Sequence, residues 1–257
     1  MTRPSQNIKL TIEYQGTQYY GWQRQKDQPS VQEEIETAIF KATNEKVNLF
    51  VAGRTDAGVH ARAQVANFST TSQIGAWQIC RALNYYLPDD ITIHQSDAVP
   101  EDFNARHDSL AKRYWYNIYR GPQPAALERK RSWWILENID LDLMQEAANK
   151  LVGEHDLNAF RSVHCDAKHA IRHIKSIQVE TASRIPLGEI VTIKLYANAF
   201  CRHMCRIISG TLVEIGLGKR EVSSMDLALK NRKREFAGST APAYGLTLME
   251  VEYPHQP

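Results

Sequence analysis

Apolar and polar residues alternate with a period of two at residues 8–14, the pattern of a half-buried strand. Ser30 and Glu33 then have the spacing of a capping box, and the apolar positions that follow recur at helical spacing, which predicts a helix from residue 31. Further runs predict strands at residues 47–53, 64–69 and 91–95 and a helix over 75–87 that ends before Pro88. The first part of the chain therefore has the order βαββαβ.

The same order recurs in the second part of the chain. Strands are predicted at residues 112–119, 171–181, 189–197 and 246–253, and helices at 141–152, 201–215 and 222–230. A βαββαβ unit is typical of the ferredoxin-like or RRM-like arrangement, an antiparallel sheet with helices on one face. We therefore expect an α+β protein with two such halves and a cleft between their antiparallel sheets.

Periodicity is interrupted near Pro100, which separates the two series of elements. The length of 257 residues suits two small domains. We expect an N-terminal α+β domain over residues 1–105 and a C-terminal α+β domain over residues 106–257. A hydrophobic content of 43% and a charged content of 23% are those of an ordinary soluble globular protein, so disorder and fibrous structure are not expected.

Charge is informative only where it is clustered. The formal net charge is +2, from 31 basic and 29 acidic residues, which does not identify a polyanionic partner. Basic residues gather at positions 112–113, 129–131 and 230–234. Such clusters contact phosphate groups in nucleic-acid-binding proteins, although most runs of charge only face water. Both interpretations stay open for each cluster.

The cysteines bear on location and on metal binding. Cys80, Cys165, Cys201 and Cys205 do not have the spacing of a disulfide framework, and the first residues do not resemble a signal peptide, which fits the reducing cytoplasm. No apolar run approaches the roughly 18 residues of a membrane helix, so we expect no membrane association. The spacing of Cys201, His203 and Cys205 is not that of a zinc site, and we expect no metal.

Residues 51–60, VAGRTDAGVH, place Arg54, Thr55 and Asp56 between two glycines at the end of an apolar run. The glycines allow a sharp turn or the close approach of a ligand, and the end of a strand is a common place for functional side chains. An aspartate at such a turn can equally bond its own backbone as an Asx-turn. The local sequence leaves both roles open for Asp56.

Aromatic residues are concentrated in the predicted strand at residues 112–119. A period of two places Tyr114, Tyr116 and Ile118 on one face and Trp115 and Tyr119 on the other. An aromatic side chain on an open sheet face can stack on a nucleobase, whereas most aromatic side chains pack in cores. The sequence lacks the signatures of ATP-binding loops, dinucleotide-binding loops and nucleophile elbows. Chemistry that needs ATP or a nicotinamide cofactor is therefore not expected.

Residues 53–61, GRTDAGVHA, resemble the signature of the tRNA pseudouridine synthase A family at nine consecutive positions. Other blocks resemble that family in the same order, at residues 20–25, 102–106, 112–116, 200–206 and 241–248. The resemblance spans nearly the whole chain. His107, Leu110 and Cys205 depart from the residues expected there and look like packing substitutions.

The resemblance implies a pseudouridine synthase fold and isomerisation of uridine to pseudouridine at positions 38, 39 and 40 of the tRNA anticodon stem-loop, without metal or organic cofactor. It implies that Asp56 is the catalytic aspartate and Arg206 its basic partner. By the same resemblance, Tyr114 packs on the target base and Arg54 helps to displace that base from its stack. A homodimer that binds tRNA is also implied.

The reaction breaks the bond from ribose C1′ to uracil N1 and joins C1′ to C5, so it consumes neither a redox agent nor a phosphate donor. One ionised carboxylate can start it by attacking the sugar or the base, or by removing a ribose proton, and the sequence leaves these routes open. A nearby guanidinium keeps the carboxylate ionised.

Two other functions compete with this interpretation. One is an RNA-binding protein without catalysis, for which a convincing RNP1 octamer is missing. The other is a metal-dependent nuclease built on Asp56 and His60, for which a second pair of clustered acids is missing.

Overall fold

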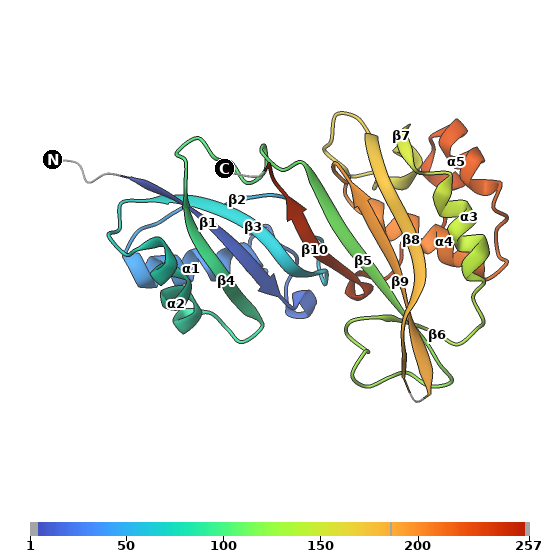
Figure 1. Ribbon diagram of the computed structural model, residues 1–257, viewed down its shortest axis with the longest axis horizontal. Helices are drawn as coiled ribbons and strands as arrows, with labels where there is room; N and C mark the ends of the chain where they lie inside the picture. The colour runs from blue at the N-terminus through green and yellow to red at the C-terminus, as the bar shows by residue number, and fades with distance from the viewer. Residues whose placement is uncertain (1–4, 186, 255–257) are drawn as a thin grey trace. The chain divides into compact units, whose positions relative to one another are not determined.

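A computed structural model describes residues 5–185 and 187–254 (Figure 1). In this part of the chain it contains five α-helices and mostly antiparallel strands, which confirms the predicted α+β class. The chain forms two compact units, Met1–Leu110 with Leu248–Pro257 and Ala111–Thr247. The predicted domains, 1–105 and 106–257, differ from these units in where they place the last strand, and the domain division itself stays a prediction.

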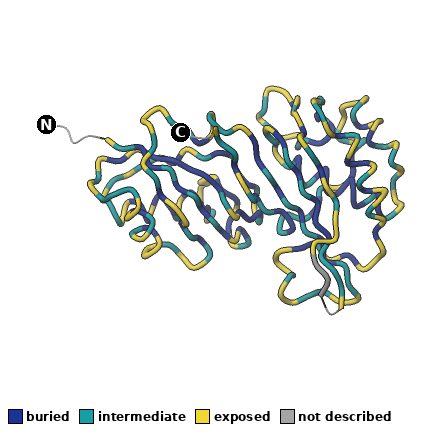
Figure 2. The backbone as a smooth tube through the Cα atoms, viewed as in Figure 1, coloured by how far each residue is buried: buried dark blue, intermediate teal, exposed yellow. Residues whose placement is uncertain are grey.

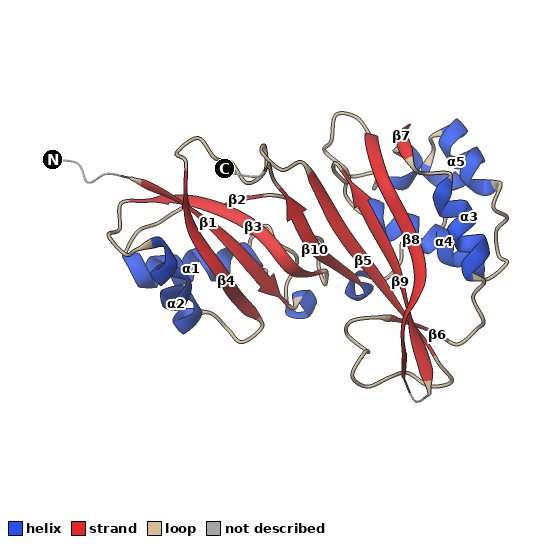
Figure 3. Cartoon of the chain, viewed as in Figure 1, coloured by secondary structure: helices blue, strands red, loops and turns tan. Residues whose placement is uncertain are grey.

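The first unit is built on an antiparallel sheet. Its strands are β1 (Gln6–Tyr14), β2 (Phe50–Val51), β3 (His60–Thr70) and β4 (Ile91–Val99). Their order is β4-β1-β3, and β2 pairs with β3. Two helices, α1 (Val31–Thr43) and α2 (Ala76–Tyr86), contact each other and lie on one side of this sheet (Figure 3).

The period of two along β1 accounts for the core of the first unit. Ile8, Leu10 and Ile12 are fully buried, and each contributes roughly 1.5 to 3 kcal/mol through burial. Helix α1 begins as predicted, because the Ser30 side-chain oxygen accepts a hydrogen bond from the main-chain N–H of Glu33 at 3.4 Å. Local sequence therefore determines both the inward face of β1 and the start of α1.

Several strands of the first unit differ in length from their predictions; β3, for example, covers His60–Thr70 and not only the predicted residues 64–69. β4 continues to Val99, beyond the predicted residues 91–95, because its second half pairs with the first residues of β1. β2 covers only Phe50–Val51 of the predicted strand at 47–53. The chain after Val51 leaves the sheet and forms the loop that carries Asp56.

The strands of the second unit also pair mainly in the antiparallel direction. Its strands are β5 (Ala111–Arg120), β6 (Trp133–Ile135), β7 (Gly153–Asp156), β8 (Ile171–Ile185) and β9 (Gly188–Ala197). Their order is β5-β9-β8-β7, with β6 parallel to β5. β6 and β7 were not predicted, because three or four residues are too few to show a period.

Three α-helices belong to the second unit: α3 (Leu141–Asn149), α4 (Met204–Gly216) and α5 (Ser224–Asn231). α4 contacts both β5 and α3 and is buried along almost its whole length (Figure 2). It begins later than the predicted residue 201, because His203 precedes it with a φ of 63°, which is not helical.

Short 3₁₀ helices and the last strand complete the chain. The 3₁₀ helices are η1 (Gly16–Gln18), η2 (Asn158–Phe160), η3 (Arg234–Phe236) and η4 (Ala243–Gly245). Strand β10 (Leu246–Glu252) begins in the second unit and passes into the first at Leu248. There the Glu252 carbonyl accepts a hydrogen bond from the Leu110 N–H at 2.8 Å.

Of the helices in the described residues, none is both long enough and apolar enough to cross a bilayer.

Candidate active site

The loop between β2 and β3 carries two of the predicted site residues. Arg54 is exposed, Asp56 is partly exposed, and Thr55 between them is buried. The main-chain carbonyl of Asp56 accepts a hydrogen bond from the Val59 N–H at 3.1 Å, which closes a turn in which Gly58 has a φ of 79°. Asp56 therefore stands at the first position of a tight turn whose conformation depends on a glycine.

The main chain that follows β1 supports this loop. The Trp22 N–H donates to the Thr55 carbonyl at 3.1 Å, and the Gly58 N–H donates to the Tyr19 carbonyl at 3.2 Å. Gly21 has a φ of 94°, and a Cβ at this position would lie only 2.5 Å from the Thr55 carbonyl oxygen. Only glycine permits so close an approach. The hydrogen bonds of Thr55 and Gly58 therefore hold the backbone on both sides of Asp56.

A buried polar cluster that the sequence did not predict lies beneath the loop. The Tyr14 hydroxyl is 2.7 Å from Oγ1 of Thr55. Nε2 of Gln64 donates to the Gly53 carbonyl at 2.8 Å and to the Tyr14 oxygen at 3.4 Å. Burial raises the pKa of Tyr14 to about 12, although the hydrogen bonds from Thr55 and Gln64 act in the opposite direction. The cluster is therefore neutral, and it fixes the side chain next to Asp56.

Tyr114, the third predicted site residue, lies on β5 in the second unit. It is buried, together with Tyr116 and Ile118, which confirms the predicted face of this strand. Its ring meets that of Phe200 edge to face, with centroids 5.3 Å apart and an interplanar angle of 87°. Phe200 belongs to the segment that leads into α4, so this contact joins the strand to the start of the helix.

Arg206, the fourth predicted site residue, lies in the first turn of α4. Its Nε donates to the Ala241 carbonyl at 2.8 Å, and the Ala241 N–H donates to the Arg206 carbonyl at 3.1 Å. Burial raises the pKa of Tyr116 well above its ordinary value; the nearby Tyr244 raises it further, and the Arg206 guanidinium lowers it. The guanidinium of Arg206 therefore lies within electrostatic range of the strand that carries Tyr114.

The structure places the four predicted residues in two groups. Arg54 and Asp56 share one loop of the first unit, whereas Tyr114 and Arg206 belong to the second unit. The pairing of Asp56 with Arg206 stays a prediction. Among the described residues, no three side chains of the types His, Cys, Asp and Glu form a group that could hold a metal ion.

Cations and aromatic rings alternate across β9 and its neighbours in the second unit. Cζ of Arg113 lies 3.6 Å from the centroid of the Tyr196 ring, and Nζ of Lys175 lies 4.7 Å from it. Nζ of Lys194 lies 5.0 Å from the centroid of the Trp115 ring. These residues occupy the sheet face opposite that of Tyr114, as the strand register requires. Guanidinium and ammonium groups beside aromatic rings are groups that bind phosphates and stack on bases.

Comparison with known proteins shows the family. A sequence model described as tRNA pseudouridine synthase matches residues 10–108 and 147–254. A protein of Acetivibrio thermocellus named tRNA pseudouridine synthase A is 46% identical over 247 residues, covering 96% of this chain and 99% of that protein. Relatives of the same name from Pseudoalteromonas atlantica and Myxococcus xanthus are 44% and 41% identical, cover 96% of this chain, and are themselves covered to 92% and 91%.

A solved structure also matches, at much lower similarity. A chain in the crystal structure of a Cbf5-Nop10-Gar1 complex is 12% identical, with a TM-score of 0.34, covering 94% of this chain and 48% of that one. A likeness of this size supports no conclusion about fold or function. The family model and the sequence relatives do, because they extend over most of the chain and include the loop at residues 53–61. The chain belongs to the tRNA pseudouridine synthase family.

Proposed function

We propose that this protein isomerises uridine to pseudouridine at positions 38, 39 and 40 of the tRNA anticodon stem-loop. The observation that carries the proposal is its similarity, at 46% identity and over 96% of the chain, to a protein named tRNA pseudouridine synthase A. The structure supports the proposal by the way it holds Asp56, at a turn whose backbone is fixed on both sides. A preorganised carboxylate is what a reaction without cofactors needs.

In this proposal Asp56 is the catalytic carboxylate and Arg206 is its cationic partner. Breaking the C1′–N1 bond and forming the C1′–C5 bond leaves uracil detached in between, and Tyr114 would hold the detached base by packing on it. The proton that leaves C5 is balanced by the proton that N1 gains. Arg54, which is exposed on the loop, would help to free the target base from its stack, at a cost of a few kcal/mol.

We further infer that each half has the ferredoxin-like arrangement of the pseudouridine synthase fold. In support, the first unit has the strand order β4-β1-β3-β2 with two helices on one side, and all of its pairings are antiparallel. In the second unit, β5, β9 and β8 are neighbours in the same order as β1, β3 and β2 in the first. The cleft between the sheets, the homodimer and the cytoplasmic location stay predictions, and a mass measured in solution tests the homodimer.

The experiment that tests the function follows tritium release from tRNA that carries tritium at uridine C5, with EDTA present. We expect release by the wild type and a fall of about three orders of magnitude in Asp56→Asn, because the amide cannot act as a nucleophile or base. Asp89→Asn is the matched control, since Asp89 lies exposed in the turn before β4. Equal release by Asp56→Asn and the wild type would refute the role of Asp56.

The same assay separates the two competing functions. An RNA-binding protein without catalysis would retain tRNA and release no tritium. A metal-dependent nuclease would cut the strand, and EDTA would stop it. For Arg206→Ala we expect slower turnover with tRNA binding largely preserved, and full activity would remove Arg206 from the site.

A further inference from the structure

One face of α4 lies along residues 236–242, which we call the brace segment. Arg206, Gly210 and Glu214 recur at intervals of four on this face, and Thr211 lies beside them. A Cβ at Gly210 would lie 2.0 Å from the carbonyl oxygen of Ser239, so the segment touches the helix backbone itself. The helix and the brace segment are therefore in direct backbone contact.

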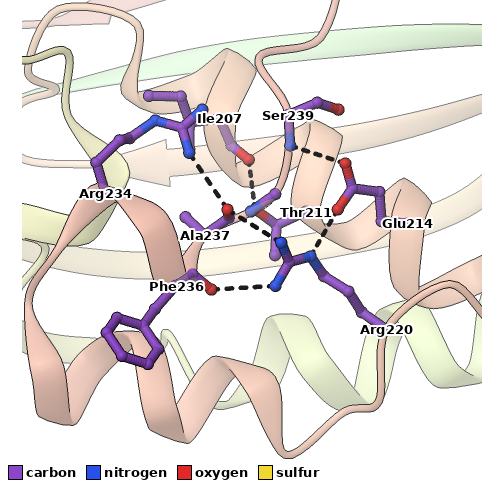
Figure 4. Close-up of polar contacts among 9 residues, drawn as sticks. Ile207, Thr211, Glu214, Arg220, Arg234, Phe236, Ala237 and Ser239 are labelled. Atoms are coloured by element: carbon purple, nitrogen blue, oxygen red, sulfur yellow. Dashed lines mark hydrogen bonds and ion pairs between the residues drawn. The ribbon is translucent and has the colours of Figure 1, made fainter.

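Side chains of α4 bind the backbone of the brace segment next to this contact (Figure 4). Oγ1 of Thr211 accepts a hydrogen bond from the Gly238 N–H at 2.9 Å and donates to the Ile207 carbonyl at 2.7 Å. Oε1 of Glu214 accepts from the Ser239 N–H at 2.8 Å. Thr211 is fully buried, so its two hydrogen bonds satisfy a hydroxyl that has no access to water.

Arg220 extends this network to the start of the brace segment. Its Nε donates to Oε2 of Glu214 at 2.6 Å, while its Nη1 and Nη2 donate to the carbonyls of Phe236 and Ala237, each at 3.3 Å (Figure 4). Burial alone would raise the pKa of Glu214, but the hydrogen bonds from Ser239 and Arg220 hold it below its usual range. The carboxylate is therefore ionised, and one guanidinium joins it to two main-chain carbonyls.

The other end of the brace segment contacts the second group of candidate site residues. The Ala241 carbonyl accepts from Nε of Arg206 at 2.8 Å, and the Pro242 carbonyl accepts from the Tyr116 hydroxyl at 2.9 Å. Ala241 itself is fully buried. A displacement of the brace segment would therefore move the acceptor that orients the Arg206 guanidinium.

We propose that Glu214 and Arg220 are positioning residues for Arg206 and act on it through the brace segment. The proposal rests on the role proposed above for Arg206. Glu214 holds the Ser239 N–H, and Arg220 holds the carbonyls of Phe236 and Ala237. The segment held in this way presents the Ala241 carbonyl to Arg206. A guanidinium displaced by about 1 Å would lose much of its effect on the reaction.

A double-mutant cycle measures this coupling. We expect Glu214→Ala to lower kcat for tritium release about tenfold and to change KM less than threefold. In the Arg206→Ala background the same substitution should change kcat less than about twofold, because the residue it positions is already gone. Asp226→Asn is the matched control, since it breaks the more exposed ion pair with Lys150 in the same unit.

Two results would overturn the positioning role. One is a wild-type kcat in Glu214→Ala, and the other is an equal fall in kcat in both backgrounds, which a general loss of stability would produce. Hydrogen exchange of the Ala241 amide gives a readout without activity, and we expect it to be faster in Glu214→Ala. Unchanged exchange would also overturn the proposal, whereas an inactive wild type would refute the proposed function alone.

Discussion

Gly210→Ala tests the contact between α4 and the brace segment most directly. The added Cβ would lie 2.0 Å from the Ser239 carbonyl oxygen, whereas ordinary van der Waals contact begins at 3.4 Å, so helix and segment must separate by about 1.4 Å. Such a shift strains the hydrogen bonds from Gly238 to Thr211 and from Ser239 to Glu214.

The magnitude follows from opposing contributions. Alanine in a helix is favoured over glycine by about 1 kcal/mol. Overpacking costs about 1 to 3 kcal/mol, and each strained hydrogen bond costs up to about 1 kcal/mol. We therefore expect the free energy of unfolding to fall by about 2 kcal/mol, which for a slope of about 2 kcal/mol/M lowers the urea midpoint by about 1 M.

Urea unfolding followed by far-ultraviolet circular dichroism measures this change. Gly75→Ala is the control, because the tightest contact of a Cβ there would be with the flexible end of Gln78, at 3.1 Å, and we expect a change within about 0.5 kcal/mol. An unchanged or increased free energy of unfolding in Gly210→Ala would refute the close backbone contact, since helix propensity alone stabilises alanine.

Three further predictions concern stability. The lowered pKa of Glu214 means that its stabilisation is present above the ordinary value of 4.5 and is lost as the pH falls through the lower folded value, so Glu214→Gln should show a shallower loss of stability from about pH 6 to about pH 3. Tyr14→Phe should cost about 1 kcal/mol by removing the hydrogen bond to Thr55. Since the pKa of Tyr14 is raised from 10.0 to about 12, the wild type should also lose stability as the pH rises between these values, and the variant should lose less. Ser30→Ala should cost about 1 kcal/mol through loss of the cap on Glu33.

Urea unfolding measures each of these changes, and each has its own contradicting outcome. Identical acid profiles for Glu214→Gln and the wild type would show that the carboxylate does not gain its charge stabilisation from Ser239 and Arg220. An equal alkaline loss in Tyr14→Phe would assign that loss to other tyrosines. An unchanged free energy of unfolding in Ser30→Ala would mean that solvent replaces the cap.

The sequence predicted the elements best where periodicity is long. β1, α1 and β5 lie close to their predicted residues, because ten or so consecutive positions share one buried face. β6 and β7 were missed, because strands of three and four residues have no measurable period. α4 begins after its prediction because of the positive φ of His203, a backbone conformation that apolar spacing does not record.

The candidate site shows the same division. The residues at 53–61 could be singled out by their glycines and by their resemblance to one family, and the relatives confirm that family. The hydrogen bonds that hold this loop could not be predicted, because the Trp22 and Gly58 bonds use backbone atoms that every residue has. Gln64 gave the one available signal for the buried cluster. It is a fully buried amide within an apolar strand, and such a group needs hydrogen-bond partners.

The sequence by itself determined the longer strands and helices, the buried face of strands such as β1 and β5, and the resemblance to one family. These properties depend on side chains that are near one another along the chain. Only the tertiary structure decided that Glu214 and Arg220 hold the segment whose Ala241 carbonyl accepts a hydrogen bond from Arg206. Most of those contacts join residues that are distant in the sequence. Several are made to main-chain carbonyls, which every residue has, so the order of side chains does not predict them.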